Sequence, residues 1–231
     1  MPMPTPSAQS VTMRPSHPLT GELAELNDRF ETSTPAEIVG WAAATFGRRL
    51  VLAASFADTL MIDIATRVDP DIEVVFLDTG YHFAETLQTV RQAMDRYALH
   101  LTVMRPAAAA ADLWADGPDA CCAARKVTVL DSYLAGRADA WLSGLRRADH
   151  PGRLTAPTVS IDARGLVKIN PIAHLGDDEV ARYVAQHDVI VNPLKDAGFA
   201  SIGCWPCTEP SVERRAGRWS GTAKTECGLH R

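Results

Sequence analysis

The stretch Leu50-Val-Leu-Ala-Ala-Ser-Phe-Ala-Asp58 decides the fold class of this sequence. Its first five residues form a short apolar run, which is typical of a buried strand, and a loop of small and polar residues follows directly. An apolar helical pattern then covers 60–68, and a second buried strand is predicted over 74–77, ending in Asp78-Thr-Gly80. A strand, a helix and a further strand in this order indicate a parallel sheet.

The same alternation continues outward from this unit. Thr34-Pro-Ala-Glu37 is typical of a helix start, since it combines a capping box with proline at the first helical position. Further helices are predicted over 35–47, 83–97, 127–134 and 178–187, and further strands over 101–104, 140–143, 158–161 and 166–169. The last two strands read as a hairpin. The expected fold is therefore α/β, a parallel sheet with a mixed edge and with helices on both faces.

Composition limits the possible classes of protein. The chain has 231 residues, of which 46% are hydrophobic and 22% charged, as expected for a protein that buries a core. The net charge of -5 argues against nucleic acid as the main partner. No window of eighteen apolar residues predicts a membrane span. Residues 1–20 are rich in proline, lack the pattern of a signal peptide and are expected to be a disordered arm of a cytoplasmic protein.

Polar loops follow three of the predicted strands: Ser55–Asp58, Asp78–Gly80 and Gly144–Arg147. Because the carboxyl ends of parallel strands share one edge of a sheet, these loops are expected to lie together and to offer backbone N–H groups to an anion. Arg146 and Arg147 are suited to phosphate or sulfate. Neither a P-loop nor a GxGxxG motif is present, so the loops point only to a nucleotide-type ligand.

Four of the five cysteines fall into two pairs, Cys121-Cys122 and Cys204-Trp-Pro-Cys207. Four thiolates from two pairs suit either tetrahedral zinc or a [4Fe-4S] cluster. Adjacent cysteines favour the cluster, because consecutive side chains diverge and each can then bind a different iron. The alternative, that the vicinal pair is simply small and buried, is weakened by its polar neighbours, such as Asp119 and Lys126.

Cys227 is the unpaired cysteine. It lies in Lys224-Thr-Glu-Cys-Gly-Leu-His230, which is too short and polar to be core. The spacing leaves two readings open, a nucleophilic or redox thiol favoured by nearby cations and an incidental exposed thiol. The basic residues just before it likewise suit either an anion site or a solvated face. These are Arg214, Arg215, Arg218 and Lys224, with Arg231 after it.

Several segments together resemble the adenylylsulfate and phosphoadenylylsulfate reductases of sulfate assimilation. The resemblance runs from about residue 50 to the end. The segments that carry it are Leu77-Asp-Thr-Gly-Tyr-His-Phe-Ala-Glu-Thr86, Cys121-Cys122 with Arg125-Lys-Val127, Gly144-Leu-Arg-Arg147, Lys168-Ile-Asn-Pro171, Asn192-Pro-Leu194, Ser201-Ile-Gly-Cys-Trp-Pro-Cys-Thr208, Ala216-Gly-Arg-Trp219 and Lys224-Thr-Glu-Cys-Gly-Leu-His230.

The resemblance implies a fold of the adenine nucleotide α-hydrolase type and the iron–sulfur subgroup, whose substrate is adenylylsulfate, whose reductant is thioredoxin and whose products are sulfite and AMP. It also implies a homo-oligomer. The implied cluster ligands are Cys121, Cys122, Cys204 and Cys207. The implied catalytic residues are Cys227, Lys126 and Arg218. The implied substrate-binding residues are Ser55, Asp58, Leu77, Asp78, Gly80, Gly144, Arg146 and Arg215.

The chemistry implied is a two-step transfer. The Cys227 thiolate attacks the sulfur of adenylylsulfate, AMP leaves, and a second thiol releases sulfite from the S-sulfonate on Cys227. If the four paired cysteines hold a cluster, that thiol must come from an external dithiol. The cluster is expected to set the electrostatics rather than to carry electrons. One departure from the family is Ala123-Ala124, which stands where arginine usually follows the cysteine pair, and Arg125 is the expected substitute.

Three competing readings share the same residues. The first takes phosphoadenylylsulfate, or both nucleotides, as substrate. The second makes the chain a non-catalytic iron–sulfur sensor that binds a nucleotide, and the third places zinc between the four cysteines. In domain terms, the expectation is an α/β nucleotide-binding domain with cluster ligands over 21–203 and a C-terminal segment over 204–231 that carries the CxxC and a mobile catalytic tail.

Overall fold

The computed structural model describes residues 18–230, and its centre is a six-stranded sheet in the order β3-β2-β1-β4-β6-β5. The strands are β1 Leu50–Ala54, β2 Glu73–Leu77, β3 His100–Met104, β4 Ala140–Ser143, β5 Val159–Ile161 and β6 Val167–Ile169. Every pairing is parallel except that of β5 with β6, which lies at the edge. The expected parallel sheet with a mixed edge is confirmed.

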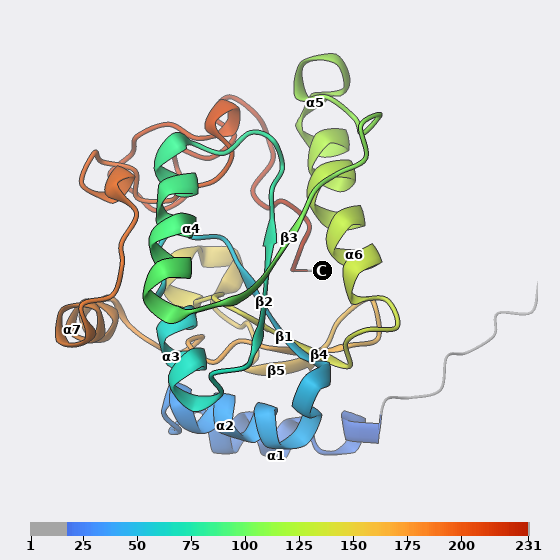
Figure 1. Cartoon of the computed structure of the whole chain (residues 1–231), viewed down its shortest axis with the longest axis vertical. Helices are drawn as coiled ribbons and strands as arrows, with labels where there is room; N and C mark the ends of the chain where they lie inside the picture. The colour runs from blue at the N-terminus through green and yellow to red at the C-terminus, as the bar shows by residue number, and fades with distance from the viewer. Residues whose placement is uncertain (1–17, 231) are drawn as a thin grey trace, which may run out of the picture.

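Helices lie on both sides of this sheet (Figure 1). They are α1 Leu23–Phe30, α2 Pro35–Phe46, α3 Leu60–Val68, α4 Ala84–Tyr97, α5 Leu113–Cys122, α6 Thr128–Leu134 and α7 Asp177–His187. A π-helical turn, Ala123–Val127, joins α5 to α6. The capping box of α2 is present as expected, since Thr34 accepts from the Glu37 backbone and the Glu37 carboxylate accepts from the Thr34 N–H.

The two faces of the sheet are covered unequally. Successive strand residues alternate between them, so Leu52 joins the larger core, formed with α1, α2, α3, α4 and α7, while Val51 joins the smaller core. The smaller core is covered by α6 and, beside it, by Leu229 near the chain end. In Figure 1 the last described residues run toward α6. Leu229 thus covers part of the second face beside α6.

The helix expected after the vicinal cysteines is present as α6, and the structure adds a helix before them. Cys121 and Cys122 end this helix, α5, which starts at Leu113. Asp112 caps this helix by accepting from the backbone of Trp114 and Ala115. Gly117, with φ of 80°, and the following proline interrupt the helical pattern, and this hides the helix in the sequence.

Some expectations fall partly outside the described residues. Of the arm expected over 1–20, residues 1–17 are not described, and Pro18–Gly21 forms a short 3-10 helix. The division at 203/204 stays a prediction. Within 18–230, no helix is both long and apolar enough to cross a bilayer.

Candidate active site

The loops expected to bind a nucleotide meet at one edge of the sheet. Strands β2, β1 and β4 are parallel neighbours, so Leu77, Ser55 and Gly144, at or just after their carboxyl ends, share that edge. Ser55 and Gly144 are exposed there. The backbone after Ser55 turns sharply, because Phe56 takes a left-handed conformation with φ of 56°. The sequence therefore placed these loops together correctly, while their contacts with a ligand stay a prediction.

The two aspartates of these loops shape the backbone. Asp58 accepts from the N–H of Leu60 at 3.1 Å, and Asp78 accepts from the N–H of Gly80 at 3.1 Å. The other oxygen of Asp78 accepts from Arg105 at 2.9 Å. Both carboxylates thus hold the loops in position, as Asx turns do.

Arg146 has a different environment from the one expected. Its side chain is 7% exposed and donates to Asp149 and Asp177, both at 3.0 Å, and to two backbone carbonyls. Arg214 bridges the same two aspartates at 2.6 Å each. These contacts join the loop after β4 to α7 and to the segment before Arg215. Direct contact of Arg146 with an anion stays a prediction, and its observed contacts are structural.

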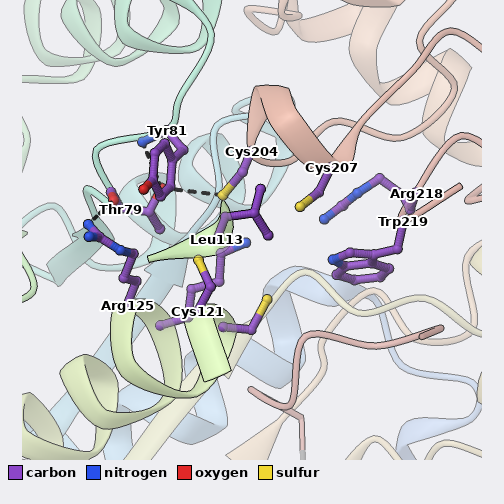
Figure 2. A pocket seen from close by; sticks show the side chains of 11 residues that line it. Thr79, Tyr81, Leu113, Cys121, Arg125, Cys204, Cys207, Arg218 and Trp219 are labelled. Carbon is purple, nitrogen blue, oxygen red and sulfur yellow. Dashed lines mark hydrogen bonds between the residues drawn. The ribbon is translucent and has the colours of Figure 1, made fainter. Parts of the chain in front are cut away.

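The four paired cysteines line one pocket, although 82 residues separate Cys122 from Cys204. Figure 2 shows the thiols of Cys121, Cys204 and Cys207 directed into a common space. The CxxC reaches this place because the backbone of Cys204 pairs with that of His82, and the N–H of Trp205 donates to the carbonyl of Tyr81 at 2.8 Å. The fold therefore brings the two pairs together, as the sequence predicted.

Polar groups on the pocket wall contact the thiols. The Thr79 hydroxyl lies 3.3 Å from the Cys204 sulfur. Arg125 also lines the pocket, and it donates to the backbone carbonyls of Thr79 and Ala111 at 3.2 and 2.8 Å. This arginine therefore provides a fixed cation beside the cysteines, where Ala123 and Ala124 provide none.

Burial favours the protonated forms of the pocket thiols Cys121, Cys122 and Cys207, because it raises their pKa values. Burial raises the pKa of Cys121, and the nearby Cys204 acts in the same direction. Burial also raises the pKa of Cys122 to about 11, and it raises that of Cys207, again with Cys204. Thiols with such values are protonated at neutral pH, so a bound metal centre would have to displace their protons.

The four thiols line one pocket, and thiolate sulfurs are ligands both for zinc and for iron–sulfur clusters. In the part of the chain that the structure describes, no three His, Cys, Asp or Glu side chains form a group that could hold a metal ion. The cluster and the zinc ion therefore both stay predictions.

Lys126 lies between the cysteine pocket and the tail. It follows Cys122 by one helical turn and lines the pocket. Burial opposes its charge, but Cys204 and Cys227 outweigh burial, so the pKa of Lys126 is raised. Lys126 therefore stays charged near Cys204 and Cys227, and its catalytic role stays a prediction.

Residues 224–230, called the tail below, are packed against the domain. Lys224 donates to Asp119 on α5 at 2.5 Å, and Glu226 accepts from Arg153 at 2.7 and 2.9 Å. Gly228 takes a left-handed φ of 86°, and a side chain there would press on Val127 at 3.3 Å. These contacts place the partly buried Cys227 beside Lys126. The mobility of the tail stays a prediction.

The end of the tail reaches the second face of the sheet. Leu229 packs into the smaller core, and the ring of His230 stacks on Trp141 with centroids 5.9 Å apart. Burial, together with the cations Lys168 and Arg153, lowers the pKa of His230 well below its usual range. The His230 ring is therefore neutral at neutral pH.

Arg215 and Arg218 extend from the same loop toward different partners. Arg215, with a left-handed φ of 63°, donates to Glu226 at 3.1 Å, whereas Arg218 lines the cysteine pocket. Arg218 stacks on Trp219 at 4.4 Å and donates to the carbonyl of Ile202 at 3.4 Å. Arg215 thus contacts the tail and Arg218 the cysteine pocket, and no helix forms over residues 215–218.

Sequence reasoning gave no site role to Arg153 or Lys168, and it treated His230 only as a neighbour of Cys227. Lys168 on β6 and His230 in the tail both lie against Trp141, and Arg153, from the loop after β4, lowers the pKa of both. Lys168 is 6% exposed, and its register opposite Trp141 puts both side chains on one face of the sheet. The available signal was the buried position of a lysine inside a predicted strand.

Comparison with known proteins places this site in a family. The family model described as "Phosphoadenosine phosphosulfate reductase domain" matches residues 49–210. Two proteins named adenosine 5'-phosphosulfate reductase are 45% identical over 219 residues in Mycobacteroides abscessus and 44% identical over 227 residues in Streptomyces coelicolor. The first alignment covers 90% of each chain, and the second covers 91% of this chain and 96% of the relative.

Solved structures agree with these relatives. The phosphoadenylyl-sulfate reductase of Candida auris, in a phosphate complex, superposes with a TM-score of 0.74 at 25% identity and covers 84% of this chain and all of that one. The FMN adenylyltransferase of Candida glabrata shares the fold alone, with a TM-score of 0.61 at 13% identity over 88% of this chain and 69% of its own. The fold expected from the resemblance is confirmed, and the chain belongs to the phosphoadenosine phosphosulfate reductase family.

Proposed function

We propose that this chain reduces adenylylsulfate to sulfite and AMP in sulfate assimilation, with Cys227 as the nucleophile. The observation that carries this proposal is the packing of the tail around Cys227: Lys224 binds Asp119 on α5, and Gly228 lies close to Val127, which directly follows the pocket-lining Lys126. The names of the relatives, adenosine 5'-phosphosulfate reductase, support the choice of substrate.

In the first step the Cys227 thiolate attacks the sulfur of adenylylsulfate. A bond forms between the two sulfurs, the bond from sulfur to the bridging oxygen breaks, and its electron pair leaves on the phosphate of AMP. Cys227 then carries an S-sulfonate. Because an anionic thiolate approaches an anionic sulfate, cations around the site lower the barrier, and Lys126, Arg215 and Arg218 are the groups suited to that role.

In the second step an external dithiol, thioredoxin in this proposal, attacks the Cys227 sulfur. The bond between the two sulfurs breaks, sulfite leaves with the electron pair, and the mixed disulfide is resolved by the second thiol of the dithiol. The dithiol is thereby oxidised to a disulfide, and the Cys227 thiol is restored. The other four cysteines of the chain line the pocket, which leaves none to serve as the resolving thiol.

The pocket cysteines, Cys121, Cys122, Cys204 and Cys207, would hold a [4Fe-4S] cluster. When bound, the cluster supplies local charge and fixes the pocket wall beside the substrate site. The residues of the chain itself then act as follows. Arg125 and Thr79 hold the wall through their hydrogen bonds, and Lys126 presents its ammonium group toward Cys227.

The test is sulfite release by the purified protein with thioredoxin and its reductase, with adenylylsulfate or phosphoadenylylsulfate as substrate. Release from adenylylsulfate at a clearly higher kcat/KM is expected, and a preference for phosphoadenylylsulfate would contradict the substrate. Iron and acid-labile sulfide are measured on the same protein, and about four of each per chain are expected. One tightly bound zinc ion would overturn the cluster. The homo-oligomer is tested by light scattering.

A further inference from the structure

In the tail, the carboxylate of Glu226 binds two arginines of the site. The two oxygens of Glu226 accept from Nε and Nη2 of Arg153 at 2.7 and 2.9 Å, and one of them also accepts from Arg215 at 3.1 Å. Both arginine side chains are only 12% exposed. Burial alone would raise the pKa of Glu226, but Arg153 outweighs it and the pKa is lowered, so this carboxylate is charged at neutral pH.

This geometry is the one by which arginine binds oxyanions. A guanidinium fork donates two parallel hydrogen bonds to two oxygens of one carboxylate, phosphate or sulfate. In the described structure Glu226 fills that fork on Arg153, and the remaining Nη1 lies 3.8 Å from Asp149. The fork therefore holds one anion at a time, and a substrate oxyanion can take it only if Glu226 leaves.

The neighbourhood of the pair is otherwise short of acceptors. Nε of Arg215, Nη2 of Arg164 and Nδ1 of His230 are buried and lack a hydrogen-bond partner within residues 18–230. Lys168 adds a further buried cation near His230. The two guanidinium nitrogens without a partner, on Arg215 and Arg164, suit an anion that has more oxygens than one carboxylate.

Glu226 directly precedes Cys227, so the contacts of the Glu226 carboxylate also fix the position of the Cys227 thiol. The chain from Glu226 to Gly228 has little freedom to move, because a Cβ added to Gly228 would lie only 3.3 Å from Val127 and Leu229 is packed against the smaller core. If Glu226 leaves the arginines, the thiol loses its nearest fixed neighbour along the chain.

We infer that Glu226 is a positioning residue for Cys227 and that its carboxylate holds the place of the substrate oxyanion on Arg153 and Arg215 until an oxyanion displaces it. This inference rests on the proposed function, since it concerns the same site. Substrate binding and release of the tail are then linked, because the substrate oxyanion and the Glu226 carboxylate compete for the same two guanidinium groups. A tail released in this way also exposes the Cys227 sulfur to an external thiol.

The test compares wild type with Glu226→Gln, Arg153→Gln and Glu213→Gln, all as anaerobic holoprotein. Glu213 is an exposed carboxylate on the neighbouring loop and serves as the matched control. The first measurement is the rate at which iodoacetamide alkylates Cys227, followed by peptide mass. Both Glu226→Gln and Arg153→Gln are expected to react roughly tenfold faster than wild type, because a charge-assisted pair is lost. The control is expected to react at the wild-type rate.

The second measurement is AMP binding by calorimetry, in which the two variants are expected to change the Kd for AMP in opposite directions. Glu226→Gln removes a competitor and is expected to lower the Kd for AMP about threefold or more, whereas Arg153→Gln removes a donor and is expected to raise it. Alkylation of Glu226→Gln at the wild-type rate, or a raised Kd for AMP in that variant, would overturn the inference. If wild type itself bound no AMP, the proposed function would fail instead.

Discussion

Lys168 is a buried cation whose removal is expected to stabilise the protein. Its side chain lies under the tail, 5.7 Å from the centre of the Trp141 ring, with 6% of the residue exposed. Among the acids of residues 18–230, Asp162 raises the pKa of Lys168 most. Its carboxylate already accepts from Arg164 at 2.8 Å and from Trp141 at 3.0 Å. Burial, and then the nearby Arg153, lowers the pKa of Lys168 from 10.5 to about 8.

The size of the effect follows from that shift. The difference between 10.5 and 8 is 2.5, and at about 1.4 kcal/mol per pH unit the charged form costs roughly 3 kcal/mol in the folded state. The attraction of the ammonium for the Trp141 ring returns about 1 kcal/mol. Lys168→Met keeps most of the side-chain volume, so the free energy of unfolding at pH 7 is expected to rise by about 2 kcal/mol.

The effect has a defined pH range. Between pH 8 and 10.5 the unfolded chain binds more protons at Lys168 than the folded chain does, so this group makes wild-type stability rise with pH there. The advantage of Lys168→Met is therefore full below pH 8 and fades as the pH approaches 10.5.

The assay is urea unfolding of holoprotein at pH 7 and pH 9.5, with identical cluster content. Lys195→Met is the matched control, because its ammonium donates to the carbonyl of Ala200 at 3.0 Å and its loss should not stabilise. A Lys168→Met protein less stable than wild type at pH 7 would refute the reasoning. So would an equal advantage at both pH values.

Three further substitutions test other parts of the account. Leu142→Ala, at a fully buried position of β4, should cost about 2–5 kcal/mol in urea unfolding, and a loss below about 1 kcal/mol would contradict the assigned core. Gly203→Ala places a Cβ against the Arg218 guanidinium, so S-sulfonation of Cys227 should slow about tenfold with an unchanged far-UV spectrum; an unchanged rate would remove Arg218 from the site. Lys126→Met should slow the same step about 100-fold in single-turnover assays, and an effect on substrate KM alone would contradict its role in the transition state.

The central part of the fold could be predicted from the sequence, because the local hydrophobic pattern and the tertiary structure agree there. The run over Leu50–Ala54 and the helix Leu60–Val68 appear in the structure with the predicted boundaries. Both are short, strongly apolar and bounded by polar residues, so burial decides their conformation. Helix α5 could not be predicted, because Gly117 and the proline after it break the helical pattern, and the backbone of Gly117 is non-helical in the structure as well.

The cysteine pocket was predicted from residue types, but its wall was not. Two thiol pairs indicate a shared site wherever they lie in the sequence, and the structure places them together. The contact of Glu226 with Arg153 spans 73 residues and depends on how the tail packs, which no local spacing encodes. The same holds for the contact of Arg146 with Asp177, which spans 31 residues.

The most direct test of the central claim is the intact mass of the protein after anaerobic incubation with adenylylsulfate and no reductant. Wild type is expected to gain the mass of one sulfonate group, mapped to Cys227, and to lose it as sulfite when reduced thioredoxin is added. Cys227→Ser is expected to gain nothing. The absence of an adduct on wild type with the cluster intact, or an equal adduct on Cys227→Ser, would contradict Cys227 as the nucleophile.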